Sequence, residues 1–366
     1  MEFEIGIGKS ARRAYGFDEV AIVPSRRTRD PEDVSIAWEI DAYTFGLPMM
    51  AAAMDAAVSP ATAIEVGKLG GLACLNLEGV WTRYEDPDPI YDEIAGLPDD
   101  KATRRMQELY AEPIREDLIG RRIQEIKAGG VVACGSLTPQ RVERYAKLVL
   151  EAELDILVIQ GTVVSGEHVS SRHEPLNLKQ FVPSFDIPVV VGGCASYATA
   201  LHLMRTGAVG VPQATAIADA AAARREHLHE TGRYCHVIAD GGMRTGGDIA
   251  KAVACGADAV MIGSPLTRSF EAPGRGYHWG MATFHPTLPR GARVKTQQVA
   301  SLREIMVGPA HENDGTFNLF GALATSMATT GYETIKEFQK AELVIAPAIK
   351  TEGKTYQTQQ RVGMGH

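Results

Sequence analysis

The sequence contains no run of about 18 apolar residues, which is the length that a membrane-spanning helix needs. Its first 16 residues also contain no continuous hydrophobic region of the kind found in secretory signals. The formal net charge is −8, and no block rich in Lys and Arg offsets it, which argues against general nucleic-acid binding. We therefore expect a cytoplasmic protein whose partners are neither a membrane nor a nucleic acid.

Cysteine is scarce and is not arranged for metal binding. The chain has five cysteines, an odd number, and none of them forms a CxxC pair. The histidines show no metal-like spacing with acids or cysteines. The sequence therefore predicts reduced thiols and no metal site. The five positions are Cys74, Cys134, Cys194, Cys235 and Cys255.

A GxGxxG motif followed by an acidic residue is also missing near the start, which argues against an open doubly wound sheet. The chain instead alternates short apolar runs with helical stretches, a pattern typical of a parallel sheet covered on both faces. With 366 residues and about eight such units, we expect an α/β fold of the (β/α)8 TIM-barrel type. The runs predicted as strands are residues 47–53, 72–75, 131–134, 155–159, 187–193, 236–240 and 258–262.

Three changes in composition divide the chain. Residues 1–46 are predicted to form an N-terminal cap, and residues 47–348 the barrel. Within the barrel, the charged, proline-punctuated residues 80–128 predict a helical insertion. Residues 349–366 are polar and predict a C-terminal tail.

One unit of the barrel is defective. The helix predicted over residues 197–206 ends in Gly207-Ala208, and only Val209-Gly210-Val211 separates this turn from the next helix, predicted over residues 214–229. Three residues are too few for both a strand and the loop that should follow it. The sequence therefore predicts that one strand and its C-terminal loop are deleted.

Residues 236–264 form the best-defined unit, with two apolar runs that each end in glycine. Parallel strands bring their C-terminal ends to one edge, where backbone N–H groups beside glycine and at a helix N-terminus suit a phosphate. Asp240 lies beside the first glycine pair, where its carboxylate can accept hydrogen bonds from ribose hydroxyls. We favour this interpretation over two ordinary turns.

Six motifs together resemble the inosine-5′-monophosphate (IMP) dehydrogenase and guanosine-5′-monophosphate (GMP) reductase family. They occur in the family's order and span most of the chain. The resemblance is to a short dehydrogenase-related branch without CBS regulatory domains, and residues 80–128 replace the regulatory insertion. The motifs cover residues 17–24, 48–55, 211–219, 238–251, 257–264 and 280–281.

The resemblance implies a purine nucleotide site. Asp240 would bind the ribose hydroxyls, and Tyr277 or His278 would reach the phosphate. The family's nicotinamide cofactor would contact the loop at the end of the strand 155–159, where Gln160 replaces the dehydrogenase's usual acid. The phosphate is assigned to Gly242, Gly263 and Ser264, the base to Gly280 and Met281, and the cofactor NAD to Gln160, Gly161 and Thr162.

The deletion falls where the family carries its nucleophilic cysteine, whose thiolate attacks C2 of the purine before hydride passes to NAD. The family's flap with an Arg-Tyr pair is also absent or very short after Met281. Cys194, which follows a Gly-ended strand, is the one cysteine in a position to substitute, and packing is the favoured interpretation for it. We therefore assign no catalytic nucleophile.

Three functions follow from the resemblance. The first is oxidation of IMP to xanthosine monophosphate (XMP) with NAD in guanine nucleotide biosynthesis, by a homotetramer. The second is NADPH-dependent reduction of GMP, which needs the same cysteine. The third is purine-nucleotide binding without catalysis. Family membership favours the first, and the missing cysteine loop favours the third.

Overall fold

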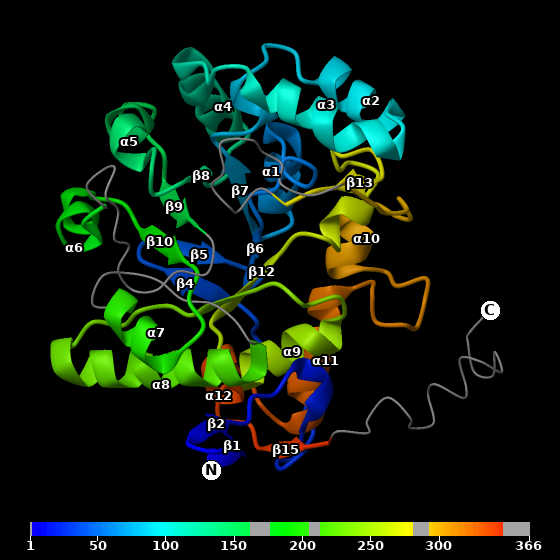
Figure 1. The fold of residues 1–366 in the computed structure, drawn as a ribbon. Coiled ribbons are helices and arrows are strands. Elements are labelled where there is room, and N and C mark those ends of the chain that lie inside the picture. The colour runs from blue at the N-terminus through cyan, green and yellow to red at the C-terminus, as the bar shows by residue number, and fades with distance from the viewer. Residues whose placement is uncertain (1, 162–175, 205–212, 281–292, 347–366) are drawn as a thin grey trace.

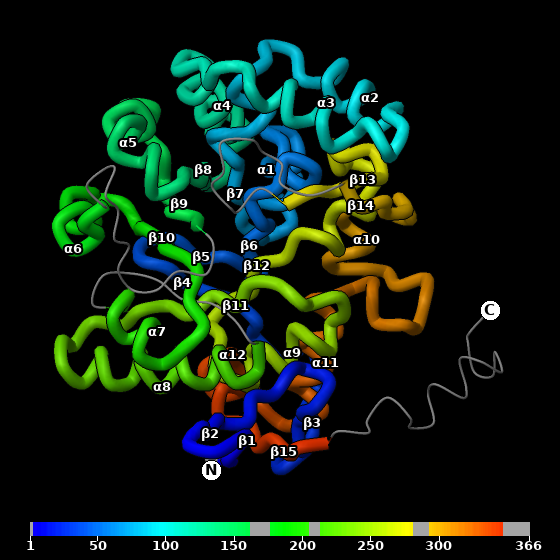
Figure 2. Tube along the Cα trace, viewed as in Figure 1, coloured from blue at the N-terminus to red at the C-terminus, as the bar shows by residue number. Residues whose placement is uncertain are grey.

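Seven parallel strands curl into an arc and form the centre of the structure (Figures 1 and 2). The computed structural model describes residues 2–161, 176–204, 213–280 and 293–346. The strands are short and most of their residues are buried, as expected for a parallel sheet covered by helices. The α/β, TIM-barrel-like fold is thus confirmed. In spatial order the strands are β10 (Val189–Gly192), β9 (Ile156–Gln160), β8 (Cys134–Leu137), β7 (Leu72–Asn76), β6 (Met49–Ala51), β12 (Ala259–Ile262) and β11 (Ile238–Asp240).

The arc ends at β10 and β11, which are the two edge strands of the described sheet. In the sequence these two strands flank the defective unit. Residues 209–211, the remnant of that unit, lie outside the described residues. The strand order therefore agrees with the prediction that one strand is missing between these two.

Helices cover the outer face of the arc (Figure 1). Helix α1 begins as the sequence indicates, with Pro60 in its first turn and the Ser59 hydroxyl accepting a hydrogen bond from the Thr62 N–H at 3.0 Å. One large apolar cluster fills the space between the helices and the sheet. The covering helices are α1 (Pro60–Lys68), α5 (Val142–Glu151), α6 (Leu178–Phe181), α7 (Tyr197–Met204), α8 (Gln213–Thr231), α9 (Gly246–Ala254), α10 (Leu302–Val307), α11 (Leu319–Thr330) and α12 (Ile335–Phe338).

One strand lies later than predicted. The predicted strand 131–134 overlaps β8 only at Cys134, where β8 begins. The start of β8 is set by its neighbours, because Cys134 pairs with Cys74 of β7 and with Ile156 of β9. Residues 131–133 form the approach to the strand, and the Ala133 N–H donates to the Asp155 carboxylate at 2.7 Å.

The N-terminal hairpin of β4 (Trp38–Ile40) and β5 (Tyr43–Phe45) closes one end of the arc. Trp38 and Phe45 stack and join an apolar cluster with the residues that point into the arc. Trp38 Nε1 donates to Nδ1 of His236, which precedes β11, at 3.3 Å. The hairpin therefore lies at the N-terminal ends of the strands, and the C-terminal ends form the other end of the arc.

The remaining short elements lie outside the seven-stranded sheet. Residue Ile345 of β15 pairs with Val20 of β3, so a segment near the C-terminus lies beside one near the N-terminus. The elements are β1 (Glu2–Gly6), β2 (Lys9–Arg12), η1 (Phe17–Glu19), β3 (Val20–Ile22), η2 (Pro31–Asp33), η4 (Val182–Ser184), η5 (Leu266–Arg268), β13 (Tyr277–His278), β14 (Val294–Lys295) and β15 (Leu343–Ile345).

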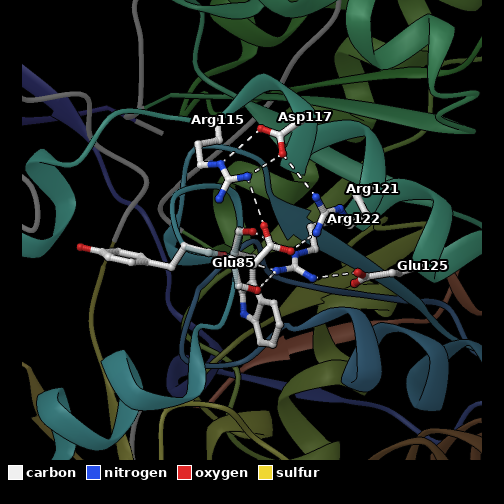
Figure 3. Close-up of polar contacts among 8 residues, drawn as sticks. Glu85, Arg115, Asp117, Arg121, Arg122 and Glu125 are labelled. Carbon is white, nitrogen blue, oxygen red and sulfur yellow. Dashed lines mark hydrogen bonds and ion pairs between the residues drawn. The ribbon is translucent and has the colours of Figure 1, made fainter.

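Residues 80–128 are helical, as predicted, and lie beside the arc as η3 (Val80–Thr82), α2 (Asp88–Gly96), α3 (Asp99–Ala111) and α4 (Glu116–Ala128). Arg122 of α4 is buried and donates to the carbonyl oxygens of Trp81 at 3.0 Å and Glu85 at 2.7 Å (Figure 3). Its guanidinium also lies over the Trp81 ring. Arg122 thus fixes the start of the insertion on α4, whereas the exposed ion pairs of Glu85 with Arg115 and Arg121 stabilise little.

Candidate functional site

The C-terminal ends of β11 and β12 bring four of the predicted site residues together. Asp240 is the last residue of β11 and pairs with Met261 of β12, so Gly241-Gly242 follows β11 next to where Gly263-Ser264 follows β12. Because the strands are parallel and adjacent, Asp240, Gly242, Gly263 and Ser264 lie at one edge of the sheet. This is the arrangement that the sequence predicts.

Asp240 has an unusual environment for a carboxylate. Its side chain is reached by solvent, yet the surrounding protein raises its pKa to about 6 through desolvation. Desolvation is the cause of this rise in pKa, and no cation among the described residues offsets it. A carboxylate held in this way is available to accept hydrogen bonds from a ligand.

The glycines after Asp240 have a conformation that other residues rarely adopt, with φ of +86° at Gly241 and +75° at Gly242. Gln213, the first residue of α8, donates a side-chain N–H to the main-chain oxygen of Asp240. A Cβ on Gly242 would lie 3.5 Å from Cγ of Gln213. Gln213 therefore supports this loop, a role that its motif at residues 211–219 did not reveal.

The second glycine turn is bordered by Met54. The Gly263 carbonyl oxygen accepts from the Leu266 N–H at 2.9 Å, which starts the turn into η5. A Cβ on Gly263 would collide with Sδ of Met54 and would lie 3.3 Å from Cβ of Ala52. A side chain here would force Met54 to shift, so glycine lets the end of β6 approach β12 closely, and Met54 is a site-lining residue that sequence reasoning missed.

Side chains of the protein itself cap the N-terminus of α9. The Thr245 hydroxyl accepts from the Asp248 N–H at 3.2 Å, and the Asp248 carboxylate accepts from the N–H groups of Arg244 and Thr245 at 3.0 Å. The Gly246 N–H donates to the oxygen of Gly315. The helix N-terminus that was expected to support a phosphate is therefore capped, which leaves that role to the two glycine loops.

The predicted base-contacting segment is described as far as Gly280, while Met281 lies outside the described residues. Gly280 is exposed, and a Cβ there would meet nothing within 4 Å. The Tyr277 ring lies under the Arg293 guanidinium, 4.0 Å from its central carbon, and His278 pairs with Val294 in the β13–β14 ladder. The Tyr277 ring thus packs against Arg293.

Gln160 and Gly161 lie at the C-terminal end of β9, at the same end of the arc as Asp240, whereas Thr162 lies outside the described residues. Gln160 pairs with Gly192 of β10, and the Gly161 N–H donates to the Gly192 oxygen at 2.8 Å. Gln160 is half-buried, so its neutral amide offers both a donor and an acceptor at the mouth of the arc.

The structure favours the packing interpretation of Cys194. The residue is buried, and desolvation raises the pKa of its thiol to about 12. Desolvation also raises the pKa of Cys134, Cys235 and Cys255, so none of these thiols is activated as a nucleophile. Cys235 precedes β11.

Within the described ranges, no group of three or more His, Cys, Asp or Glu residues is arranged to hold a metal ion. The described helices also include none that is long and apolar enough to cross a membrane.

Comparison with known proteins identifies the family. The model of the IMP dehydrogenase / GMP reductase domain matches residues 14–208 and 205–355. The chain belongs to this family. The match falls into two pieces that meet at residues 205–208, next to the predicted deletion.

Relatives in the IMP dehydrogenase / GMP reductase family cover nearly the whole chain. An uncharacterized oxidoreductase of Mycolicibacterium smegmatis is 47% identical over 371 residues, with 93% of this chain and 99% of the relative covered. The crystal structure of an IMP dehydrogenase/GMP reductase-like protein from Corynebacterium glutamicum superposes with a TM-score of 0.88 at 44% identity, covering 94% of this chain and 97% of that one. An inosine-5′-monophosphate dehydrogenase of Methanocaldococcus jannaschii is 26% identical, with 72% and 74% covered.

The alignment with the Mycolicibacterium smegmatis relative also bears on the deletion. It spans 371 positions, more than the 366 residues of this chain, although it covers 93% of them. The relative therefore carries residues with no counterpart here, as expected if this chain lacks a segment.

Proposed function

We propose that this chain binds IMP at the ends of β11 and β12 and oxidises it to XMP with NAD as the hydride acceptor. The observation that carries the proposal is the side-by-side placement of Asp240 and the two glycine turns. Asp240 would hold the ribose hydroxyls, while Gly242, Gly263 and Ser264 would hold the phosphate. Gly280, which is exposed and unobstructed, would contact the purine.

The cofactor would bind at the end of β9. The half-buried Gln160 fits the neutral carboxamide of a nicotinamide, to which it can both donate and accept hydrogen bonds. A Cβ on Gly161 would lie 3.6 Å from Cγ of Pro139, so the turn is already closely packed on one side. We also propose that the protein is a homo-oligomer, a tetramer by family resemblance.

The proposal is tested by measuring NADH formation from IMP and NAD with the purified protein, after confirming that its intact mass is 39.4 kDa. The proposal predicts turnover, and turnover at this mass would point to Cys194 or to a nucleophile not assigned from the sequence. GMP with NADPH is the comparison pair, and turnover with that pair alone would make the protein a reductase instead. Binding of IMP without turnover of either pair would overturn the oxidoreductase proposal and leave the nucleotide site standing.

The second candidate function is purine-nucleotide binding without catalysis. The cysteines favour it, because Cys194, which lies at the site's end of the arc, is buried and has a thiol pKa of about 12. A thiol with this pKa is almost entirely protonated near neutral pH and cannot add to the purine.

The affinity for IMP is expected to depend on the ionisation of Asp240. With a pKa of about 6, this carboxyl group is largely protonated at pH 5 and becomes a charged, stronger acceptor above pH 6. Wild-type affinity should therefore rise between about pH 5 and pH 8, and Asp240→Asn should flatten that rise. Calorimetric titrations of both proteins measure it. The second pKa of the IMP phosphate, near 6, affects both proteins alike, so equal pH profiles would contradict the assignment of Asp240.

A further inference from the structure

Trp279 is buried directly before the exposed Gly280, the residue to which the purine is assigned. Its indole is 1% exposed and lies against Tyr91 of α2, with ring centroids 6.4 Å apart. Its Nε1 donates to the hydroxyl of Tyr110 on α3 at 2.9 Å. The residue before the proposed base contact is therefore fixed on the helical insertion, not on the barrel.

Tyr110 links Trp279 to Asp55, which lies just beyond the end of β6. Its hydroxyl accepts from Trp279 and donates to the carboxylate of Asp55, so both roles of the hydroxyl are used. Asp55 is fully buried and also accepts from the Val80 N–H at 3.0 Å, while its main-chain oxygen accepts from the Tyr91 hydroxyl at 2.7 Å. Burial raises the pKa of Asp55, and the hydrogen bonds from Tyr110 and Val80 oppose that rise.

Asp55 lies beside the proposed phosphate site. Met54, the preceding residue, lies against Gly263. The following residue, Ala56, accepts from the Gly274 N–H at 3.1 Å through its main-chain oxygen. Asp55 is thus placed between the turn that would hold the phosphate and the segment that would hold the base.

Two arginines hold the same segment on the insertion. Arg275 forms ion pairs with Asp88 at 3.0 Å and Asp92 at 2.6 Å, both on α2. Arg293 lies over the Tyr277 ring and donates to the carbonyl oxygens of Ile94 and Leu97. The insertion therefore holds part of the segment 274–279, while Gly274 donates to Ala56 and Gly276 accepts from the Thr296 N–H outside the insertion.

We propose that the helical insertion positions the purine-binding segment, with Tyr110 as the positioning residue that joins Trp279 to Asp55. The inference rests on the proposed assignment of Gly280 to the purine. Tyr110 touches no ligand itself. It sets the place of Gly280 relative to Gly263 and so determines how well one ligand spans the base and phosphate positions.

The test compares Tyr110→Phe with Tyr84→Phe. Tyr110→Phe removes the hydroxyl that joins Trp279 and Asp55 and keeps the ring. Tyr84→Phe is the matched control, because it also removes a hydroxyl from the insertion, one that donates to the Leu109 oxygen at 2.8 Å rather than joining Trp279 to Asp55. We expect Tyr110→Phe to weaken IMP binding by about tenfold and Tyr84→Phe to change it little, as measured by calorimetry.

A second variant, Trp279→Phe, removes the indole donor and leaves the bond between Tyr110 and Asp55 in place. It should weaken IMP binding as Tyr110→Phe does, with a further loss of thermal stability from the cavity that the smaller ring leaves. Equal weakening by Tyr84→Phe and Tyr110→Phe would show a general loss of stability and overturn the proposal.

Amide hydrogen exchange separates this inference from the proposed function. In the ligand-free protein, exchange over residues 274–280 should accelerate in Tyr110→Phe and in Trp279→Phe but not in Tyr84→Phe. If wild-type protein binds no IMP while exchange changes as expected, the proposed function fails and the positioning role stands. Unchanged exchange in all three variants would overturn the positioning role.

Discussion

Replacing Gly79 by alanine is expected to destabilise the protein by about 3 kcal/mol, which is at the upper end for overpacking of a buried site. A Cβ at this position would lie 2.5 Å from Cγ of Asp55, closer than real side chains approach. Asp55 cannot move aside, because the N–H of Val80 and the hydroxyl of Tyr110 hold its carboxylate. Urea unfolding at neutral pH measures the loss.

Gly96→Ala is the control for this substitution. Gly96 ends α2, in the same insertion, and a Cβ there would meet nothing within 4 Å. Its substitution should leave the free energy of unfolding nearly unchanged. A Gly79→Ala protein as stable as Gly96→Ala would show that the Asp55 cluster is looser than the structure indicates.

The second large effect is expected from Arg224→Met, at the N-terminal side of β12. Asp258 is 1% exposed in its side chain and accepts from Nη1 of Arg224 at 2.7 Å. Burial alone would raise the pKa of Asp258, but the positive charges of Arg224 and Lys336 have the larger effect and lower it. Removing Arg224 leaves a buried carboxylate short of its buried partner, and we expect a loss of about 3–5 kcal/mol in urea unfolding.

Lys336→Met is the matched control, because Lys336 contacts the same carboxylate but its side chain is 56% exposed. Lys336→Met should lower the free energy of unfolding much less than Arg224→Met does. The pH dependence has a definite sign: a lowered pKa stabilises the protein above the ordinary value near 3.9, and this contribution disappears as the pH falls through the folded-state pKa. The difference in the free energy of unfolding between wild type and Arg224→Met should therefore shrink in acid. A difference that stays constant with pH would contradict the pairing of Arg224 with a charged Asp258.

Much of the fold was predictable because barrel strands are buried on both faces and so appear as continuous apolar runs. The prediction was wrong in detail at residues 131–134, since the start of β8 is set by its partners in β7 and β9. Local sequence does not contain that information. The glycine turns after β11 and β12 were predictable from local sequence, because segments whose backbones approach closely favour glycine.

Other features of the site depend on contacts between distant segments. Nothing near Asp55 in the sequence indicates that Tyr110 and Trp279 complete its hydrogen bonds. The sequence predicted an anion site at the N-terminus of α9, whereas the Asp248 side chain caps that helix. The raised pKa of Asp240 likewise results from protein that surrounds it in space.

The gap between β10 and β11 has a mechanical consequence. A closed barrel fixes its own radius, because every strand is held from both sides. Within the described strands, this arc is held from both sides everywhere except at its two ends. Asp240 at one end and Gln160 near the other are therefore connected through β12, β6, β7 and β8, so any bending of these four strands changes the separation of the proposed nucleotide and cofactor positions directly.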